Sequence, residues 1–191
     1  MADNETFIGG IDLGGTKIFS ICTDTHLRVL GSDWRETEAD GGRDHVIDRM
    51  VASMLAAAGG RKIVAAGVST PGPSNPKVGI VTTPPNLPGW RDVPLARLIG
   101  ERLGIPARIE NDANAAAVAE HRLGAGKGTQ HMLLATLGTG IGGGLVLNGR
   151  LYHGASGAAG EIGHIHLVDN GPRCGCGSHG CLEALASGRA L

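Results

Sequence analysis

The stretch Leu133-Leu-Ala-Thr-Leu-Gly-Thr-Gly-Ile-Gly-Gly-Gly-Leu-Val-Leu-Asn-Gly-Arg-Leu151 holds the most informative pattern of the chain, because two apolar runs flank a cluster of glycines. Gly138, Gly140 and Gly143 have the G-x-G-x-x-G spacing of dinucleotide-binding proteins. Such a site needs a helix directly after the glycines, since the helix N-terminus holds the pyrophosphate. Here Asn148-Gly149 follows a short apolar run and indicates a two-residue hairpin. The stretch therefore predicts an antiparallel meander rather than a dehydrogenase site.

A second glycine turn lies near the N-terminus, at Asp12-Leu-Gly-Gly-Thr-Lys17, also between two strand-like runs. Bare backbone N–H groups in such turns can bind an anion, the Thr16 hydroxyl adds a donor, and Asp12 can help to hold Mg²⁺ directly or through water. Two facing turns would clamp a polyphosphate, although each turn alone could be only a tight turn. The residues expected at the phosphates are Asp12, Gly14, Gly15, Thr16, Lys17, Gly138, Thr139, Gly140 and Gly142.

Composition places the chain among ordinary globular proteins that can bury one good core or two small ones. Its 191 residues are 41% hydrophobic, with 17 Lys+Arg against 18 Asp+Glu. We expect no nucleic-acid partner because there is no basic cluster, and no membrane span because no apolar run reaches about 18 residues. The N-terminal sequence MADNETFIGG lacks the basic start and apolar core of a signal peptide, so we expect a cytoplasmic protein.

Hydrophobic periodicity predicts an α/β protein. The expected strands are 7–12, 17–23 and 28–36, which form a meander, followed by 62–70, 107–112, 131–138 and 143–151; the expected helices are 43–58, 94–104 and 113–124; and 71–76 is a proline-rich loop. Asp112 then lies where a strand meets a helix N-terminus, a place where it could simply cap the helix. We expect two domains, 1–120 and 121–191, with the boundary within or just after the last helix.

Three of the four cysteines, Cys174, Cys176 and Cys181, fall within a short C-x-C-x4-C segment. They are too close together for a typical disulfide framework, and in a reducing compartment metal binding is the better interpretation, with three unliganded surface thiols as the alternative. Cys22 stands alone in the apolar run KIFSICT, which favours a plain core residue.

Six motifs together resemble the ROK family, which includes bacterial glucokinases and related sugar kinases. They are DLGGTK (12–17), GVSTPGP (67–73), END (110–112), LGTGIGGG (137–144), EIGH (161–164) and CGCGSHGCLE (174–183). The resemblance implies the actin-like, ribonuclease-H-like ATPase fold, in which two α/β domains close over a sugar and ATP. It covers the chain from its first strand almost to its end.

The resemblance also implies roles for individual residues. Asp112 resembles the catalytic base that takes a proton from the sugar hydroxyl as this hydroxyl attacks the γ-phosphate of ATP. The implied sugar-binding residues are Gly72, Asn111, Asp112, Glu161, His164 and Glu183. Carboxylates that accept hydrogen bonds from several hydroxyls would discriminate strongly between sugars.

By the same resemblance, His164 joins Cys174, Cys176 and Cys181 as ligands of one Zn²⁺. A closed Cys3His set has no open position to activate water, so the implied zinc is structural and fixes the loop that carries Glu183. His166 and His179 are competing imidazoles, and the sequence alone leaves them open.

ROK kinases continue well beyond the segment that matches the last residues of this chain, ASGRAL, so we expect a C-terminally truncated member in which the second domain is incomplete. We expect an ATP-dependent hexose kinase, with glucose as the leading substrate and N-acetylmannosamine, fructose and allose as alternatives. Whether the 191-residue chain is active, and whether a donor other than ATP serves, stay open. A non-catalytic sugar-binding fragment and a sugar-responsive repressor are the rival interpretations, but only six residues precede Phe7, where a repressor would carry its DNA-binding domain. A homodimer or homotetramer is implied by analogy.

Overall fold

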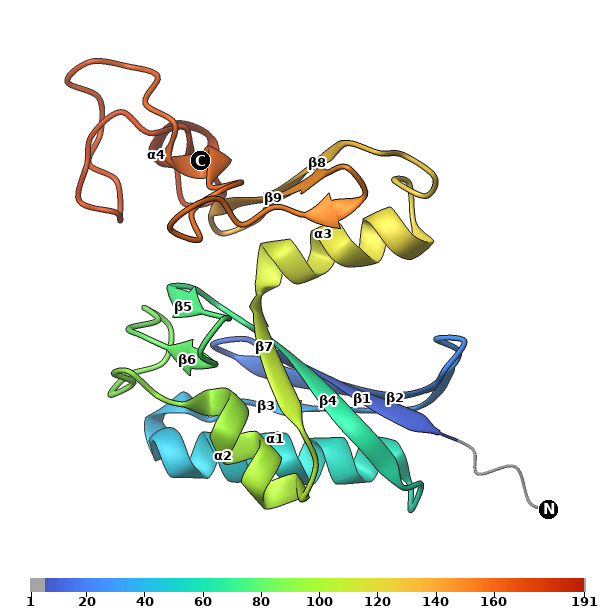
Figure 1. The fold of residues 1–191 in the computed structure, drawn as a ribbon. Helices are drawn as coiled ribbons and strands as arrows, with labels where there is room; N and C mark the ends of the chain where they lie inside the picture. The colour runs from blue at the N-terminus through green and yellow to red at the C-terminus, as the bar shows by residue number, and fades with distance from the viewer. Residues whose placement is uncertain (1–5, 191) are drawn as a thin grey trace. The chain divides into compact units, whose positions relative to one another are not determined.

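The computed structural model describes residues 6–190, which divide into two compact units between Asp112 and Ala113 (Figure 1). Helix α3 (Asp112–Leu123) begins at this division. The predicted boundary after residue 120 therefore falls inside a helix that belongs, from Ala113 onward, to the second unit. The physical reason is that α3 packs its small side chains against a glycine-rich strand of that unit.

A five-stranded mixed sheet forms the centre of the first unit, with the strand order β3-β2-β1-β4-β7. Its strands are β1 (Phe7–Leu13), β2 (Lys17–Asp24), β3 (Val29–Glu36), β4 (Ile63–Thr70) and β7 (Ala107–Asn111). The first three are antiparallel, which confirms the predicted meander, and β4 and β7 continue the sheet in parallel to β1. The α/β class expected from the sequence is therefore confirmed.

Two helices, α1 (Arg43–Ala58) and α2 (Leu95–Leu103), cover one face of this sheet (Figure 1). The apolar positions at helical spacing in α1 are mostly buried, and Gly59 ends the helix in the left-handed conformation with φ 57°. Met54 of α1 lies so close to β1 that a Cβ at Gly9 would come within 2.5 Å of its sulfur. Cys22 is fully buried in the same core, which confirms that it is a core residue.

The proline-rich segment that follows β4 contains structure that the sequence did not predict. Ser74–Asn75 (β5) pairs with Ile80–Val81 (β6), and the carbonyl of Pro73 accepts hydrogen bonds from both the N–H and the hydroxyl of Thr82 at 2.9 and 2.8 Å. A short 3-10 helix, η1 (Ala39–Gly41), precedes α1. Among residues 6–190, no helix is long and apolar enough to cross a bilayer.

The second unit is built on a three-stranded antiparallel sheet in the order β10-β9-β8. Its elements are β8 (Met132–Leu137), β9 (Ile141–Leu147), β10 (Arg150–Leu151), the 3-10 helix η2 (Ile162–His164) and helix α4 (Leu182–Ala186). Asn148 and Gly149 form the turn between β9 and β10 with φ values of 51° and 70°. The predicted meander is thus confirmed, and the glycines run directly into a strand rather than a helix.

The three glycines Gly142–Gly144 make room for close packing on both faces of β9. A Cβ at Gly144 would lie 2.5 Å from the Cβ of Ala117 on α3, and a Cβ at Gly143 would lie 2.5 Å from the carbonyl oxygen of Gly160. A helix and a loop therefore approach this strand at distances that only hydrogen atoms permit.

We expect Gly144→Ala to destabilise the second unit by about 1–3 kcal/mol, because the added methyl group overpacks the contact with Ala117. Urea unfolding followed by the resonances of Tyr152 would measure this loss, since the only tyrosine lies in the second unit. Gly67→Ala in β4 is the matched control, because nothing lies within 4 Å of the position that its methyl group would take. Equal stability of the Gly144 variant and this control would contradict the packing argument.

Candidate functional site

The three parallel strands of the first unit, β1, β4 and β7, have their carboxyl ends at the same edge of the sheet. Several predicted site residues lie at this edge. Asp12 on β1 is in register with Ser69 on β4, and Thr70 is in register with Asn111 on β7. The Ser69 hydroxyl donates a hydrogen bond to Asp12 Oδ1 at 2.9 Å, which orients the carboxylate. The carboxyl ends of parallel strands are where α/β sheets bind ligands. Ser69 belongs to the GVSTPGP motif, but its role toward Asp12 was not predicted from the sequence.

The first glycine turn connects β1 to β2 and is fixed by Thr37, the residue directly after β3. Within the turn, the N–H of Gly14 donates to the carbonyl of Lys17 at 2.8 Å. The buried Thr37 donates its hydroxyl to the Gly14 carbonyl at 2.7 Å and its N–H to the Thr16 carbonyl at 2.9 Å. Asn86 packs behind the turn, 2.6 Å from where a Cβ of Gly15 would be. Neither Thr37 nor Asn86 was identified from the sequence, because each is far along the chain from the glycine that it contacts.

Asn111 and Asp112 lie at the junction of β7 and α3, as the sequence predicts. Asp112 is exposed and is the first residue of α3, where the helix macrodipole stabilises negative charge. Gly72 lies beside Asn111, since a Cβ on this glycine would be 3.4 Å from Asn111 Nδ2. The first unit therefore brings Gly72, Asn111 and Asp112 together.

The second glycine turn connects β8 to β9 and contains Gly138, Thr139 and Gly140. The N–H of Gly138 donates to the carbonyl of Gly140 at 3.0 Å and closes the turn. The predicted phosphate residue Gly142 lies beyond the turn, within β9, and a Cβ at this glycine would be 2.7 Å from Thr136 Oγ1. Within this hairpin, the backbone of the turn 138–140 is thus accessible to a bound anion, whereas the strand glycines 142–144 pack against neighbouring residues.

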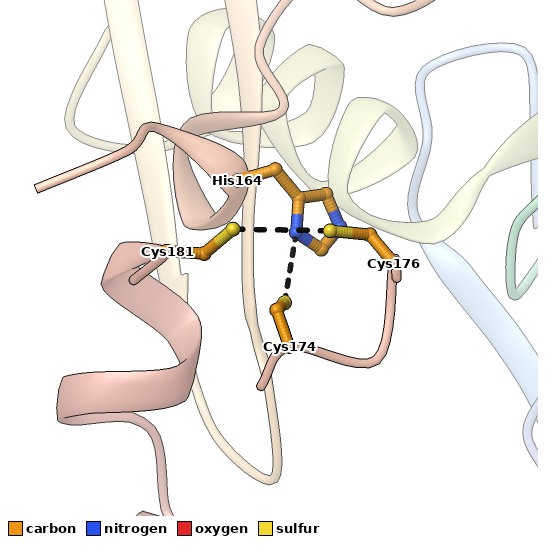
Figure 2. A group of neighbouring side chains, drawn as sticks. All are labelled: His164, Cys174, Cys176 and Cys181. Atoms are coloured by element: carbon orange, nitrogen blue, oxygen red, sulfur yellow. Dashed lines mark hydrogen bonds between the residues drawn. The ribbon is translucent and has the colours of Figure 1, made fainter. Parts of the chain in front are cut away.

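Four predicted metal ligands converge in the second unit, as Figure 2 shows. The ligand atoms of His164, Cys174, Cys176 and Cys181 all lie within 4.8 Å of one another. Cys174 Sγ is 3.6 Å from His164 Nδ1, and the sulfurs of Cys176 and Cys181 are 3.8 Å apart. Zn–S bonds of about 2.3 Å in a tetrahedron place two sulfurs about 3.8 Å apart. The four side chains therefore fit a four-coordinate cation of the zinc type.

The protonation of these thiols also favours a cation. Desolvation, followed by the contacts with Cys176 and Cys174, raises the pKa of Cys181 to about 11. The pKa of Cys176 is lowered, first by a backbone hydrogen bond at Ser178 and then by Cys174. The three sulfurs cannot all ionise side by side without a compensating positive charge, so metal binding would release protons from this cluster.

His166 and His179, the alternative imidazoles, are outside this group of four. The ring of His166 contacts the carbonyl of His179 through Nδ1 and the carboxylate of Asp169 through Nε2, both at 2.9 Å. Its pKa is raised, chiefly by the hydrogen bond to Asp169. The structure therefore brings the ring of His164, and neither alternative ring, into the group of cysteine sulfurs.

The remaining predicted sugar residues, Glu161 and Glu183, also belong to the second unit. Glu161 is exposed directly before η2, while Glu183 is half-buried on α4. Glu183 Oε2 accepts a hydrogen bond from the N–H of Ile141 at 2.9 Å, a contact that the sequence did not reveal. Gly163 lies against the backbone of Ile141, where a side chain would overlap with the carbonyl oxygen. The EIGH segment and α4 are therefore both anchored at the start of β9.

Comparison with known proteins gives a match to the ROK family model over residues 8–191. The chain is 40% identical over 182 residues to a glucokinase of Thermotoga maritima, a match that covers 95% of this chain and 57% of the relative. Two relatives at 36% identity are a xylose repressor of Bacillus subtilis, with 95% of this chain and 48% of the relative covered, and an N-acetylmannosamine kinase of Citrobacter koseri, with 95% and 61% covered. The chain thus spans little more than half the length of the glucokinase.

Solved structures agree with this assignment. A ROK hexokinase from Thermus thermophilus superposes with a TM-score of 0.85 at 44% identity, with 96% of this chain and 61% of that chain covered. A ROK family glucokinase from Streptomyces griseus, in complex with glucose and AMPPNP, gives a TM-score of 0.85 at 40% identity, with 96% and 58% covered. The fold of the chain is therefore that of the actin-like ATPases, as expected from the sequence.

Proposed function

The chain belongs to the ROK family, and from this premise we propose that it carries the phosphate-binding and sugar-binding residues of an ATP-dependent hexose kinase that converts glucose to glucose 6-phosphate. The observation that carries the proposal is the position of Asp112. Its exposed carboxylate lies at the carboxyl end of β7, beside Asn111 and Gly72, at the sheet edge that also holds Asp12. Similarity to glucokinases over 95% of the chain supports glucose as the substrate.

Asp112 acts in this proposal as the general base. The sugar hydroxyl oxygen forms a bond to the γ-phosphorus of ATP, the bond from this phosphorus to the bridging oxygen breaks, and ADP leaves. The proton of the hydroxyl passes to the Asp112 carboxylate. Phosphoryl transfer depends mostly on alignment and charge stabilisation, so one well-placed acceptor can both orient the hydroxyl and receive its proton.

Phosphate binding is assigned to the two glycine turns, 12–17 and 138–140, whose backbone N–H groups suit an anion. The carboxylate of Asp12, oriented by Ser69, suits a hydrated Mg²⁺. Sugar hydroxyls are assigned to Gly72, Asn111, Asp112, Glu161, His164 and Glu183. If a bound sugar lacks one of the expected hydroxyls, or holds it in the inverted configuration, a carboxylate of the site is buried without a hydrogen-bond partner. The free-energy cost of this unpaired group would let the site discriminate between hexoses.

His164, Cys174, Cys176 and Cys181 are the residues that would hold Zn²⁺. Because the protein fills all four positions, the metal would be structural and would supply no activated water. We expect a cytoplasmic homodimer or homotetramer with no nucleic-acid or membrane partner.

The test is sugar-dependent ADP formation from Mg-ATP by the zinc-loaded 191-residue protein, across glucose, N-acetylmannosamine, fructose and allose. We expect turnover with glucose above that with the other sugars. Preferred turnover on another hexose would keep the kinase and replace the substrate. Inorganic polyphosphate in place of ATP tests the choice of donor.

A second candidate function is sugar binding without phosphoryl transfer, favoured by the 36% identity to a xylose repressor. Calorimetry with glucose and xylose separates the candidates. Sugar binding without ADP formation would favour this second function, and a folded, metal-loaded protein that binds no sugar would contradict both.

A further inference from the structure

The second glycine turn is held from outside by the segment that follows the cysteine cluster. Helix α4 begins directly after Cys181, and its Glu183 accepts the N–H of Ile141 at the end of the turn at 2.9 Å. Five residues later, the N–H of Gly188 donates to the carbonyl of Gly138 at the start of the turn at 2.8 Å. Both ends of the turn are therefore bonded to one short segment, 183–188.

The same segment is tied to the candidate metal ligands. Cys181 is a member of the cluster and precedes α4 without a gap, while the other carboxylate oxygen of Glu183 lies 3.9 Å from the sulfur of Cys174. The N–H of Leu182 donates to the carbonyl of Ile165, next to His164, at 2.9 Å. The position of α4 thus depends on the loop that the four ligands organise.

Space around the turn shows how closely this segment fits. A Cβ on Gly140 would overlap with Glu183 Oε2, and a Cβ on Gly188 would lie 2.8 Å from the Gly138 carbonyl oxygen. The first turn is held differently, because its support comes from the buried Thr37 within the first unit. Of the two glycine turns, the second is therefore the one that is hydrogen-bonded to the segment following the cysteine cluster.

We propose that the Cys3His cluster controls the conformation of the 138–140 turn through α4, with Glu183 as a positioning residue for this turn. The coupling itself follows from contacts within the second unit. Its consequence for nucleotide affinity rests on the proposed function, in which the turn binds the phosphates of ATP. Loss of the metal would then weaken the binding of nucleotide, in addition to any effect on sugar.

Residue-resolved amide hydrogen exchange on the zinc-loaded full chain tests the coupling without sugar or nucleotide. Glu183→Ala should retain the metal, because Glu183 is outside the four-ligand group, yet it should raise exchange at the Ile141 amide by about tenfold or more. Glu183→Gln should stay close to the native rate, because its amide oxygen can still accept the Ile141 N–H. Glu101→Ala, which removes an exposed carboxylate from α2, is the matched control and should change nothing at the turn.

Chelation of the metal should raise exchange at both Ile141 and Gly188, while the Thr37 amide, which supports the first turn, keeps its native rate. Val146, whose backbone N–H faces β8 in the β8–β9 ladder, reports whether the sheet remains folded. Because we expect chelation to unfold the second unit, Val146 should exchange as well, and the metal-loaded Glu183→Ala protein isolates the contact with the turn. Native exchange at Ile141 in a metal-loaded Glu183→Ala protein would overturn the proposal.

Gly188→Ala adds a functional readout that avoids the predicted sugar residues. We expect its methyl group to displace the Gly138 carbonyl and to weaken the affinity for Mg-AMPPNP by about tenfold, with glucose affinity unchanged. Unchanged nucleotide affinity in this variant would overturn the link between α4 and phosphate binding. If native protein binds no nucleotide while the exchange coupling is present, the proposed kinase function fails and the coupling stands.

Discussion

Asp112→Asn will lower the rate of phosphoryl transfer by about 10²- to 10⁴-fold and leave sugar binding measurable. Asparagine keeps the size and hydrogen-bonding ability of the side chain, and it is as good as aspartate at the start of a helix, so α3 should still form. What it loses is the ability to take up a proton as the sugar hydroxyl attacks. The measurements are kcat for ADP formation and, separately, the Kd for glucose by calorimetry.

A matched control for this variant is Asp48→Asn, which neutralises a carboxylate on α1 that is 70% exposed. It should leave kcat within about twofold of native, since exposed charges of this kind contribute little. Near-native turnover of Asp112→Asn would exclude this residue as the base. Loss of glucose binding together with turnover would instead assign Asp112 chiefly to sugar recognition.

Removal of the metal is expected to unfold the second unit and leave the first unit folded. The main hydrophobic cluster, which includes Ile18, Met50 and Leu95, lies wholly within the first unit. Over residues 113–190, the buried apolar side chains other than alanine are Ile141, Val146 and two of the cysteines themselves. We therefore expect a unit with so small a core to need a bound metal for folding, as small metal-binding domains do.

Native protein should therefore contain one zinc per chain, and Cys174→Ser should lose it. Resonances of Trp34 and Trp90, both in the first unit, should keep their native dispersion after chelation while those of Tyr152 in the second unit collapse. Cys22→Ala is the control, because it removes a buried sulfur from the first unit without touching the cluster. A folded, native-like protein without metal would contradict both the cluster's role and the argument from core size.

Much of the fold could be predicted because its signals are local. Helix α1 begins and ends where the apolar spacing and Gly59 predict, and Asn148-Gly149 forms a turn because both residues tolerate positive φ. The two-residue strand β5 was missed, since a strand of that length is defined by its partner rather than by its own sequence. The two compact units divide at Asp112, earlier than the boundary that we expected after residue 120, because α3 contacts β9 of the second unit.

The site was only partly predictable for the same physical reason. The cysteine spacing predicted a metal site and the resemblance to ROK kinases added His164, whereas the Ile141 to Glu183 bond joins residues far apart in sequence and no local pattern predicts it. Glycines are ambiguous in another way, because bare backbone serves a bound anion and close packing equally well. Gly138 and Gly140 belong to the turn, whereas Gly143 and Gly144 are bare so that neighbouring backbone can approach.

The three glycines of β9, Gly142–Gly144, limit the mutations that this strand can accept. Every single-base missense change in a glycine codon adds at least a Cβ, and at Gly142, Gly143 and Gly144 this atom would lie 2.7 Å or less from a neighbour. Even the conservative replacement by alanine is therefore unfavourable at these three positions. In a saturation library selected for folded protein, glycine should be retained at these three positions. Gly67, with open space around it, should accept alanine.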